Sequence, residues 1–109
     1  MSQEMICVSA FYPAAGEGRF DFEYYLNRHI PLVRQLLTPL GMLRMEADEG
    51  LGGFLPGSAP NYRAIARMYF STVEEFQHAA ETAGNQIFAD IPNYTDIPVE
   101  IQVSRVRAA

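Results

Sequence analysis

The sequence of 109 residues predicts an α+β protein with the ferredoxin-like order βαββαβ. Four segments alternate with the two-residue period of a strand, and two segments have the apolar spacing of an amphipathic helix. In chain order they read strand, helix, strand, strand, helix, strand. Because no linker or low-complexity segment separates them, we expect one domain over residues 1–109, with both helices on one face of the sheet.

The four expected strands cover residues 5–12, 42–49, 62–70 and 99–106. The third is the clearest, and its alternation places Met68 and Phe70 on one face. If that face is the one that the helices leave open, a monomer would expose an apolar surface. A symmetric homodimer that buries sheet against sheet is therefore expected.

The first helix is expected to begin after Asp21, a good N-cap residue, and to end by Thr38. It ends there because the residue before Pro39 is disfavoured in helical geometry. Pro31 lies inside this helix and leaves the carbonyl of Asn27 without its usual donor. Since that carbonyl would lie on the polar side, where water can reach it, we expect a kink and not a break.

The second helix is expected to begin at a capping box, Ser71 to Glu74, and to end at Gly84, with a further helical turn allowed over 85–89. A loop at 90–98 then leads to the last strand. The remaining long connection, 51–61, is rich in glycine and proline and carries Leu51, Phe54 and Leu55. Because exposed apolar loops are costly, we expect this loop to cover a cavity or a partner subunit.

Composition and charge exclude several classes of partner. The net charge is −5, and all eight basic side chains are arginine. Such a surface repels phosphate backbones and anionic lipid, and no apolar run reaches the length of a membrane span. The first residues lack the pattern of a signal peptide, and Cys7 has no partner for a disulfide. We therefore expect a cytoplasmic protein that binds neither nucleic acid nor membrane.

The best candidate for chemistry is His29, which falls on the apolar stripe of the first helix with Tyr25 one turn earlier. An imidazole titrates near neutral pH and can serve as a general acid or base. Tyr25 could orient that ring or polarise a carbonyl group. The structural alternative is a buried histidine that is simply hydrogen-bonded, with a tyrosine that packs beside it.

A second set of residues is assigned to substrate binding: Arg67, Tyr69, Phe88, Asn93 and Tyr94. Arg67 could bind a carboxylate or an enolate oxygen, although pairing with Glu100 across the sheet is the favoured alternative. Asn93 and Tyr94 lie in a loop, where functional side chains are common, although the asparagine could equally close a turn. No pair of histidines and carboxylates has the spacing of metal ligands, so no metal is expected.

Three motifs in the expected order resemble the EthD-like proteins of the dimeric α+β barrel superfamily. They are Phe22-x-x-Tyr25-x-x-x-His29-Ile30-Pro31-Leu32, then Ala66–Phe70 followed by Ser71-x-x-Glu74-x-Phe76, then Asp90–Thr95. The resemblance covers nearly the whole chain, but the loop 51–61 matches none of its patterns. It implies a dimeric α+β barrel with a pocket inside each subunit, between the sheet and the helices.

The family is named for a small protein associated with the degradation of ethyl tert-butyl ether beside a cytochrome P450 system. Members of its superfamily include lactone isomerases, polyketide cyclases, cofactor-free monooxygenases and haem-degrading enzymes, so the fold does not decide the reaction. The resemblance implies either a cofactor-independent enzyme acting on a small apolar compound through His29, or a non-catalytic module that serves an oxidase. A third hypothesis has His29 as an axial ligand of haem.

Overall fold

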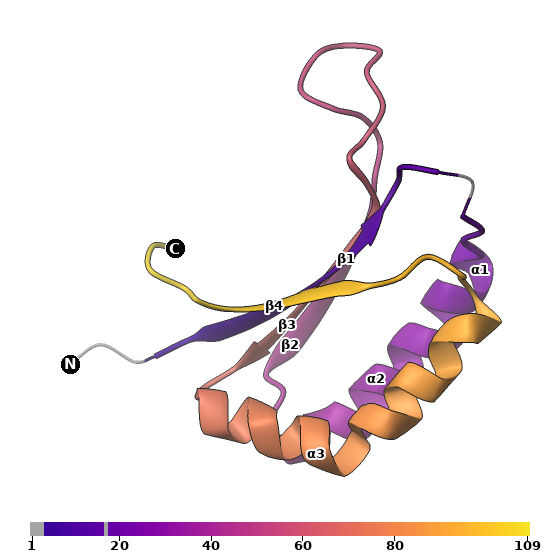
Figure 1. Ribbon diagram of the computed structural model, residues 1–109. Helices are drawn as coiled ribbons and strands as arrows, with labels where there is room; N and C mark the ends of the chain where they lie inside the picture. The colour runs from indigo at the N-terminus through magenta and orange to yellow at the C-terminus, as the bar shows by residue number, and fades with distance from the viewer. Residues whose placement is uncertain (1–3, 17) are drawn as a thin grey trace.

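The computed structural model describes residues 4–16 and 18–109, and Figure 1 shows its two layers. The strands are β1 (Ile6–Pro13), β2 (Arg44–Glu49), β3 (Tyr62–Phe70) and β4 (Glu100–Arg105). They form one antiparallel sheet in the order β2-β3-β1-β4. The helices are α1 (Phe22–Tyr24), α2 (Ile30–Leu37) and α3 (Val73–Asp90), and they lie on one side of the sheet. The ferredoxin-like α+β fold is confirmed.

The sheet turns its small and apolar side chains toward the helices. In the register, Ala10 lies between Ala66 of β3 and Ile101 of β4, and these side chains share the helix-side face. Phe70 has no exposed surface and belongs to the same core. The condition under which a monomer would expose Met68 and Phe70 on an open face is therefore not met.

The open face of the sheet instead carries Ser9, Arg67 and Tyr69, together with charged side chains of β2. Arg67 forms ion pairs with Glu46 and Asp48 on this face. The same face also carries Phe11 and Ile65, which pair across β1 and β3 and are partly exposed, so it combines polar and apolar side chains. The expected dimer stays a prediction.

The first helical segment widens in its middle. The side chain of Asp21 caps it by accepting from the backbone N–H of Tyr24 (3.1 Å), as expected. Residues Tyr25–His29 then form a π-helical turn, in which Ile30 N–H donates to the carbonyl of Tyr25, five residues back. Pro31 is the next residue after Ile30, in the first turn of α2. Since a proline ring crowds the carbonyls of the preceding turn and has no N–H to offer them, a wider turn relieves the strain that was expected to produce a kink.

A left-handed glycine ends this segment. α2 stops at Leu37, a 3-10 turn covers Thr38–Leu40, and Gly41 then has φ 112°. A side chain at Gly41 would be strained in this backbone conformation, and its Cβ would lie 2.8 Å from the carboxylate of Glu75. The end predicted before Pro39 is thus confirmed.

The second helix, α3, is longer than the sequence indicates. Its N-cap is Thr72, whose hydroxyl accepts from Glu75 N–H (3.1 Å), one residue beyond the expected cap at Ser71. The helix continues through Gly84 to Asp90, so it does not end at Gly84, and the further helical turn allowed over 85–89 is part of the same helix. Because apolar side chains continue at helical spacing to Ile87, tertiary packing overrides the low helix propensity of one glycine.

The loop over residues 51–61 extends away from both layers (Figure 1). Leu51 is 92% exposed, Phe54 100% and Leu55 67%. The loop contributes no side chain to the apolar cavity between the sheet and the helices, and contact with a partner subunit remains the prediction. Within the described part of the chain, no helix is long and apolar enough to cross a membrane.

Candidate functional site

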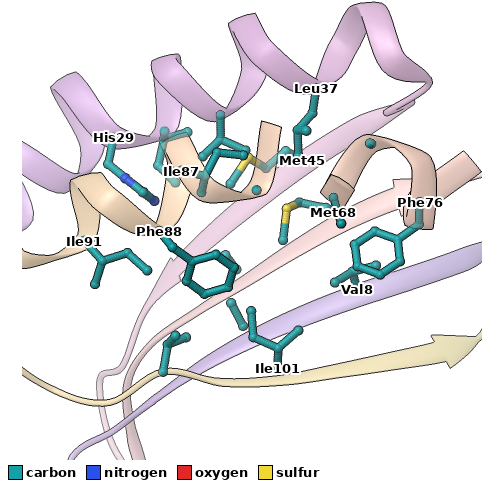
Figure 2. Close-up of a pocket in the computed structure, with 18 of the residues that line it drawn as sticks. Val8, His29, Leu37, Met45, Met68, Phe76, Ile87, Phe88, Ile91 and Ile101 are labelled. Carbon is teal, nitrogen blue, oxygen red and sulfur yellow. The ribbon is translucent and has the colours of Figure 1, made fainter. Parts of the chain in front are cut away.

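A cavity of about 190 Å³ lies between the helix-side face of the sheet and the helices α2 and α3 (Figure 2). Its wall is mostly apolar and includes Val8, Met45, Met68 and Ile87. Phe88 and Ile101, which are half exposed, belong to its rim. The volume is somewhat larger than the roughly 150 Å³ of a protein cavity known to bind benzene, so one or two fused rings can be accommodated.

His29 is the side chain in this wall whose ordinary pKa lies near neutral pH. It is only 4% exposed, and it extends from its helix toward α3 (Figure 2). Its Nδ1 lies 2.9 Å from Oδ2 of Asp90, the last residue of α3. Because an ionised carboxylate only accepts hydrogen bonds, Nδ1 carries the proton of the neutral ring and donates it. Nε2 is then left with a free lone pair.

Nε2 is the ring nitrogen that remains for the cavity, because Nδ1 is hydrogen-bonded to Asp90, which is not part of the cavity lining. Nε2 has no hydrogen-bond partner among the described residues, yet it is not one of their fully buried unpaired atoms. Burial lowers the pKa of His29 more than the hydrogen bond and charge of Asp90 raise it. At neutral pH the ring is therefore uncharged and able to accept a proton.

Three polar side chains hold Asp90 in place. Its Oδ1 accepts from the hydroxyl of Tyr24 (2.7 Å) and from the amide of Asn93 (2.9 Å), while its Oδ2 accepts from His29. Burial raises the pKa of Asp90, but these three hydrogen bonds together outweigh it and keep the pKa below the usual value. Asp90 is thus an ionised carboxylate in a fixed orientation behind the imidazole.

Tyr25 lies beside His29 in the cavity wall, with the two rings nearly parallel (16°) and 5.9 Å apart. Its hydroxyl oxygen is fully buried and finds no partner among the described residues. Burial raises the pKa of this phenol well above its ordinary value, and the nearby Tyr12 adds to the shift. Tyr25 is therefore a protonated donor without an acceptor.

The other predicted site residues divide into two groups. Phe88 lines the cavity, and Tyr94 packs against His29 with ring centroids 4.5 Å apart. Asn93 is exposed and acts on Asp90, outside the cavity lining. Arg67 and Tyr69 lie on the open face of the sheet, away from the cavity that contains His29, and a role of these two in substrate binding stays a prediction.

The physical reason is the strand period, which puts residues 67 and 69 on the opposite side of β3 from Ala66 and Met68. Arg67 pairs with Glu46 and Asp48 of β2, and not with Glu100 as the sequence favoured. The guanidinium of Arg44 lies 4.2 Å from the ring centre of Tyr69. Both side chains thus have local partners away from the cavity.

Sequence reasoning does not find Asp90, Tyr24 and Tyr12. The run Asp90–Thr95 stands out as a motif, but the sequence places its aspartate in a loop. The apolar spacing from Phe76 through Ala83 to Ile87 is the signal that α3 continues and ends facing the first helix. Tyr12 gives no signal beyond its place on the buried side of a strand.

A haem does not fit this cavity. Its volume is below the roughly 300 Å³ at which sites for drug-sized ligands begin, and a porphyrin is larger still. The described lining also contains no arginine or lysine to pair with propionate groups. In addition, the described residues contain no cluster of three or more histidine, cysteine or carboxylate side chains that could hold a metal.

A family model described as the EthD domain matches residues 18–98, which include His29, Asp90 and the whole cavity wall contributed by the two helices. The chain belongs to the EthD family. An uncharacterised 11.0 kDa protein in the thcB–thcC intergenic region of Rhodococcus erythropolis is 32% identical to it over 81 residues, which are 73% of each chain.

Two solved structures place this EthD-family chain among its relatives. The crystal structure of an EthD-like protein from Ralstonia eutropha JMP134 has 34% identity and a TM-score of 0.89, covering 98% of this chain and 96% of that one. SnoaB, a cofactor-independent oxygenase from Streptomyces nogalater, has 10% identity and a TM-score of 0.63, covering 99% and 97%. The second likeness is one of fold alone.

Proposed function

We propose that this EthD-family protein acts on a small, uncharged, largely apolar organic molecule in a catabolic or biosynthetic pathway, with His29 as general acid/base. The observation that carries the proposal is the His29–Asp90 pair at the wall of an otherwise apolar cavity. Asp90 selects the tautomer whose lone pair faces the cavity, and it stabilises the imidazolium that forms when Nε2 takes a proton. Acid/base chemistry of this kind needs no cofactor.

The cavity supports an uncharged substrate. The charged side chain nearest to His29 is the carboxylate of Asp90, and the described lining offers no cationic group. Burying a carboxylate or phosphate here would cost several kcal/mol without a partner. A ring compound with a weakly acidic C–H or O–H group suits both the wall and the base.

The test is proton exchange in D₂O with 1-indanone, an uncharged bicyclic ketone. NMR follows the loss of its α-proton signal with and without the protein. The His29→Gln variant keeps a polar side chain but cannot shuttle a proton, so protein-dependent exchange should fall at least about 100-fold. The matched control is His78→Gln, since the chain's other histidine is exposed on α3.

The proposal fails if the folded His29→Gln variant exchanges indanone protons as fast as the unmodified protein. A second candidate is a non-catalytic, dimeric module that holds such a compound for an oxidase, for example in a cytochrome P450 system. Two observations favour it: the nearly apolar cavity wall, and the exposed apolar loop, which offers an oxidase or a second subunit a contact surface. Saturable binding of indanone without any exchange would support this candidate over the first.

A further inference from the structure

The buried hydroxyl of Tyr25 has a cost that the fold alone does not explain. A buried donor without a partner is destabilising, and most buried polar groups in native proteins are paired. Tyr25 lines the cavity and is only 1% exposed. Among the described residues, its hydroxyl oxygen is the one polar side-chain atom that is fully buried and has no hydrogen-bond partner. The oxygen itself has no accessible surface, so the Tyr25 ring must shift slightly before an acceptor in the cavity can satisfy it.

A second phenolic O–H group near Tyr25 also has a proton that is not used in a hydrogen bond. The hydroxyls of Tyr12 and Tyr94 lie 2.7 Å apart, and a single hydrogen bond between two hydroxyls uses one of their two protons. Tyr94 is fully buried and does not line the cavity, so its proton is best used in this bond. The unused proton then belongs to Tyr12, which lines the cavity next to Tyr25 (ring centroids 5.9 Å apart).

We propose that the hydroxyls of Tyr25 and Tyr12 bind one oxygen of the ligand, and that this oxygen is the carbonyl of a neutral ketone whose neighbouring C–H faces His29. The proposal rests on the proposed function, in that the cavity takes a small organic molecule. It assigns the substrate class: an uncharged, enolisable ring compound with a carbonyl group. Carboxylates are excluded, because the site offers two neutral donors and no cation.

The proton transfer balances within the site. Nε2 of His29 takes the proton from the carbon next to the carbonyl, and the electrons of that C–H bond form the C=C bond of an enolate. The carbonyl π electrons move onto the oxygen, where the two phenolic O–H groups stabilise the negative charge. The imidazolium formed is paired with Asp90, and returning its proton to a carbon completes an enolisation or isomerisation. Neither oxidant nor reductant is consumed.

The test compares two probes of the same shape, 1-indanone and indane, which lacks the oxygen. Dissociation constants are measured by NMR titration for the unmodified protein and for Tyr25→Phe. The variant should raise the dissociation constant of indanone about five- to tenfold, the value of one neutral hydrogen bond, and leave that of indane unchanged. The C=O stretching frequency of bound indanone should also be lower in the unmodified protein than in the variant.

Tyr69→Phe is the matched control, because this hydroxyl lies on the open face of the sheet, and it should change neither constant. Equal changes for the two probes in Tyr25→Phe, or no change for indanone, would overturn the proposal. So would failure of both probes to bind the unmodified protein. Tyr12→Phe should weaken indanone alone as well, and indanone binding that is insensitive to this change would refute the second donor.

The outcomes separate this inference from the general base. If proton exchange depends on His29 but indanone binding does not depend on Tyr25, the oxygen site is wrong and the base stands. If Tyr25→Phe weakens the ketone selectively while His29→Gln leaves exchange unchanged, the oxygen site stands and the base is wrong.

Discussion

At the scale of single residues, the pKa of His29 is subject to two opposing effects. Burial disfavours the charged ring, while Asp90 favours it, and burial dominates. The result is an imidazole that is neutral at physiological pH but has a carboxylate ready to stabilise its charged form. This combination is what a general base requires, because the group must be unprotonated before the reaction and tolerate the proton afterwards.

The lowered pKa of His29 predicts a pH-dependent stability. In the unfolded chain His29 titrates near pH 6.5, whereas in the folded protein it titrates lower. As pH falls through 6.5, the unfolded state binds a proton that the folded state still lacks, so the free energy of unfolding decreases until the folded-state pKa is passed. Urea unfolding at a series of pH values from 7 to 5 should show this decrease, and His29→Gln should remove it.

His78→Gln serves as the control for that series, since His78 is exposed and lies outside the cavity lining. An equal slope in the unmodified protein and in His29→Gln would show that other groups cause it. Asp90 contributes at lower pH, because its folded-state pKa is depressed and its contribution is lost only as pH falls below about 4.

Tyr25→Phe should stabilise the protein without ligand. Removing a buried hydroxyl that has no partner relieves its desolvation cost, so we expect a gain of about 1 kcal/mol in the free energy of unfolding and a rise of about 4 °C in Tm. The comparison is Tyr94→Phe, which removes a paired hydroxyl and should lose about 1 kcal/mol. Equal destabilisation by both substitutions would mean that the Tyr25 hydroxyl is satisfied in solution.

Among the helices and strands, the sequence predicts what depends on local pattern and misses what depends on packing. The strand at Tyr62–Phe70 and the helix end before Pro39 follow from alternation and proline geometry. Alternation does not predict which face of β3 is turned toward the helices, because both faces carry large side chains and the position of the helices decides between them. The extension of α3 past Gly84 likewise depends on contacts across the cavity.

The residues of the candidate site divide in the same way, into those predicted from local pattern and those brought together only by packing. His29 and Tyr25 are predicted together because one turn of a single helix joins them. Asp90 lies 61 residues further along the chain from His29, and only the tertiary fold brings the two side chains within hydrogen-bond distance. The π-helical turn also has no sequence signature apart from the proline that follows it.

Two glycines should respond oppositely to alanine. Gly84 lies inside α3, and an added Cβ there would have nothing within 4 Å, so Gly84→Ala should stabilise by about 0.5–1 kcal/mol through helix propensity. Gly41 has a left-handed backbone and meets Glu75, so Gly41→Ala should destabilise by more than about 1 kcal/mol. Thermal unfolding by circular dichroism measures both. A destabilising Gly84→Ala would show that α3 does not continue through this position in solution.

Over the molecule as a whole, exposed apolar side chains are grouped on the projecting loop and on the edge strand β4, with single ones elsewhere. The loop over residues 51–61 carries the most exposed side chains, and Ile101 and Val103 of the edge strand β4 are each nearly half exposed. Such surfaces in a protein of this size indicate contact with another molecule. A homodimer remains the expected form, with the loop as an apolar contribution in addition to Phe11 and Ile65 on the open sheet face.

Sedimentation at micromolar concentration should therefore show a dimer. The double change Phe54→Ser and Leu55→Ser should shift the population toward monomer, because it removes the loop's apolar contact without touching the core. Leu26→Ser, at a half-exposed position on the first helix, is the control and should leave the dimer intact. A folded monomer before any substitution would contradict the prediction.

The proposed chemistry depends on a neutral His29 that is held through Nδ1 by Asp90 and presents a free Nε2 to the ligand in the cavity. Long-range ¹H–¹⁵N NMR of the histidine rings at pH 7 observes this state, because the two ring nitrogens report which of them carries the proton. We expect an Nδ1-protonated His29 whose Nε2 signal shifts on addition of 1-indanone, while His78 is unchanged. A proton on Nε2, or saturable indanone binding that leaves the His29 signals unmoved, would refute this role for His29.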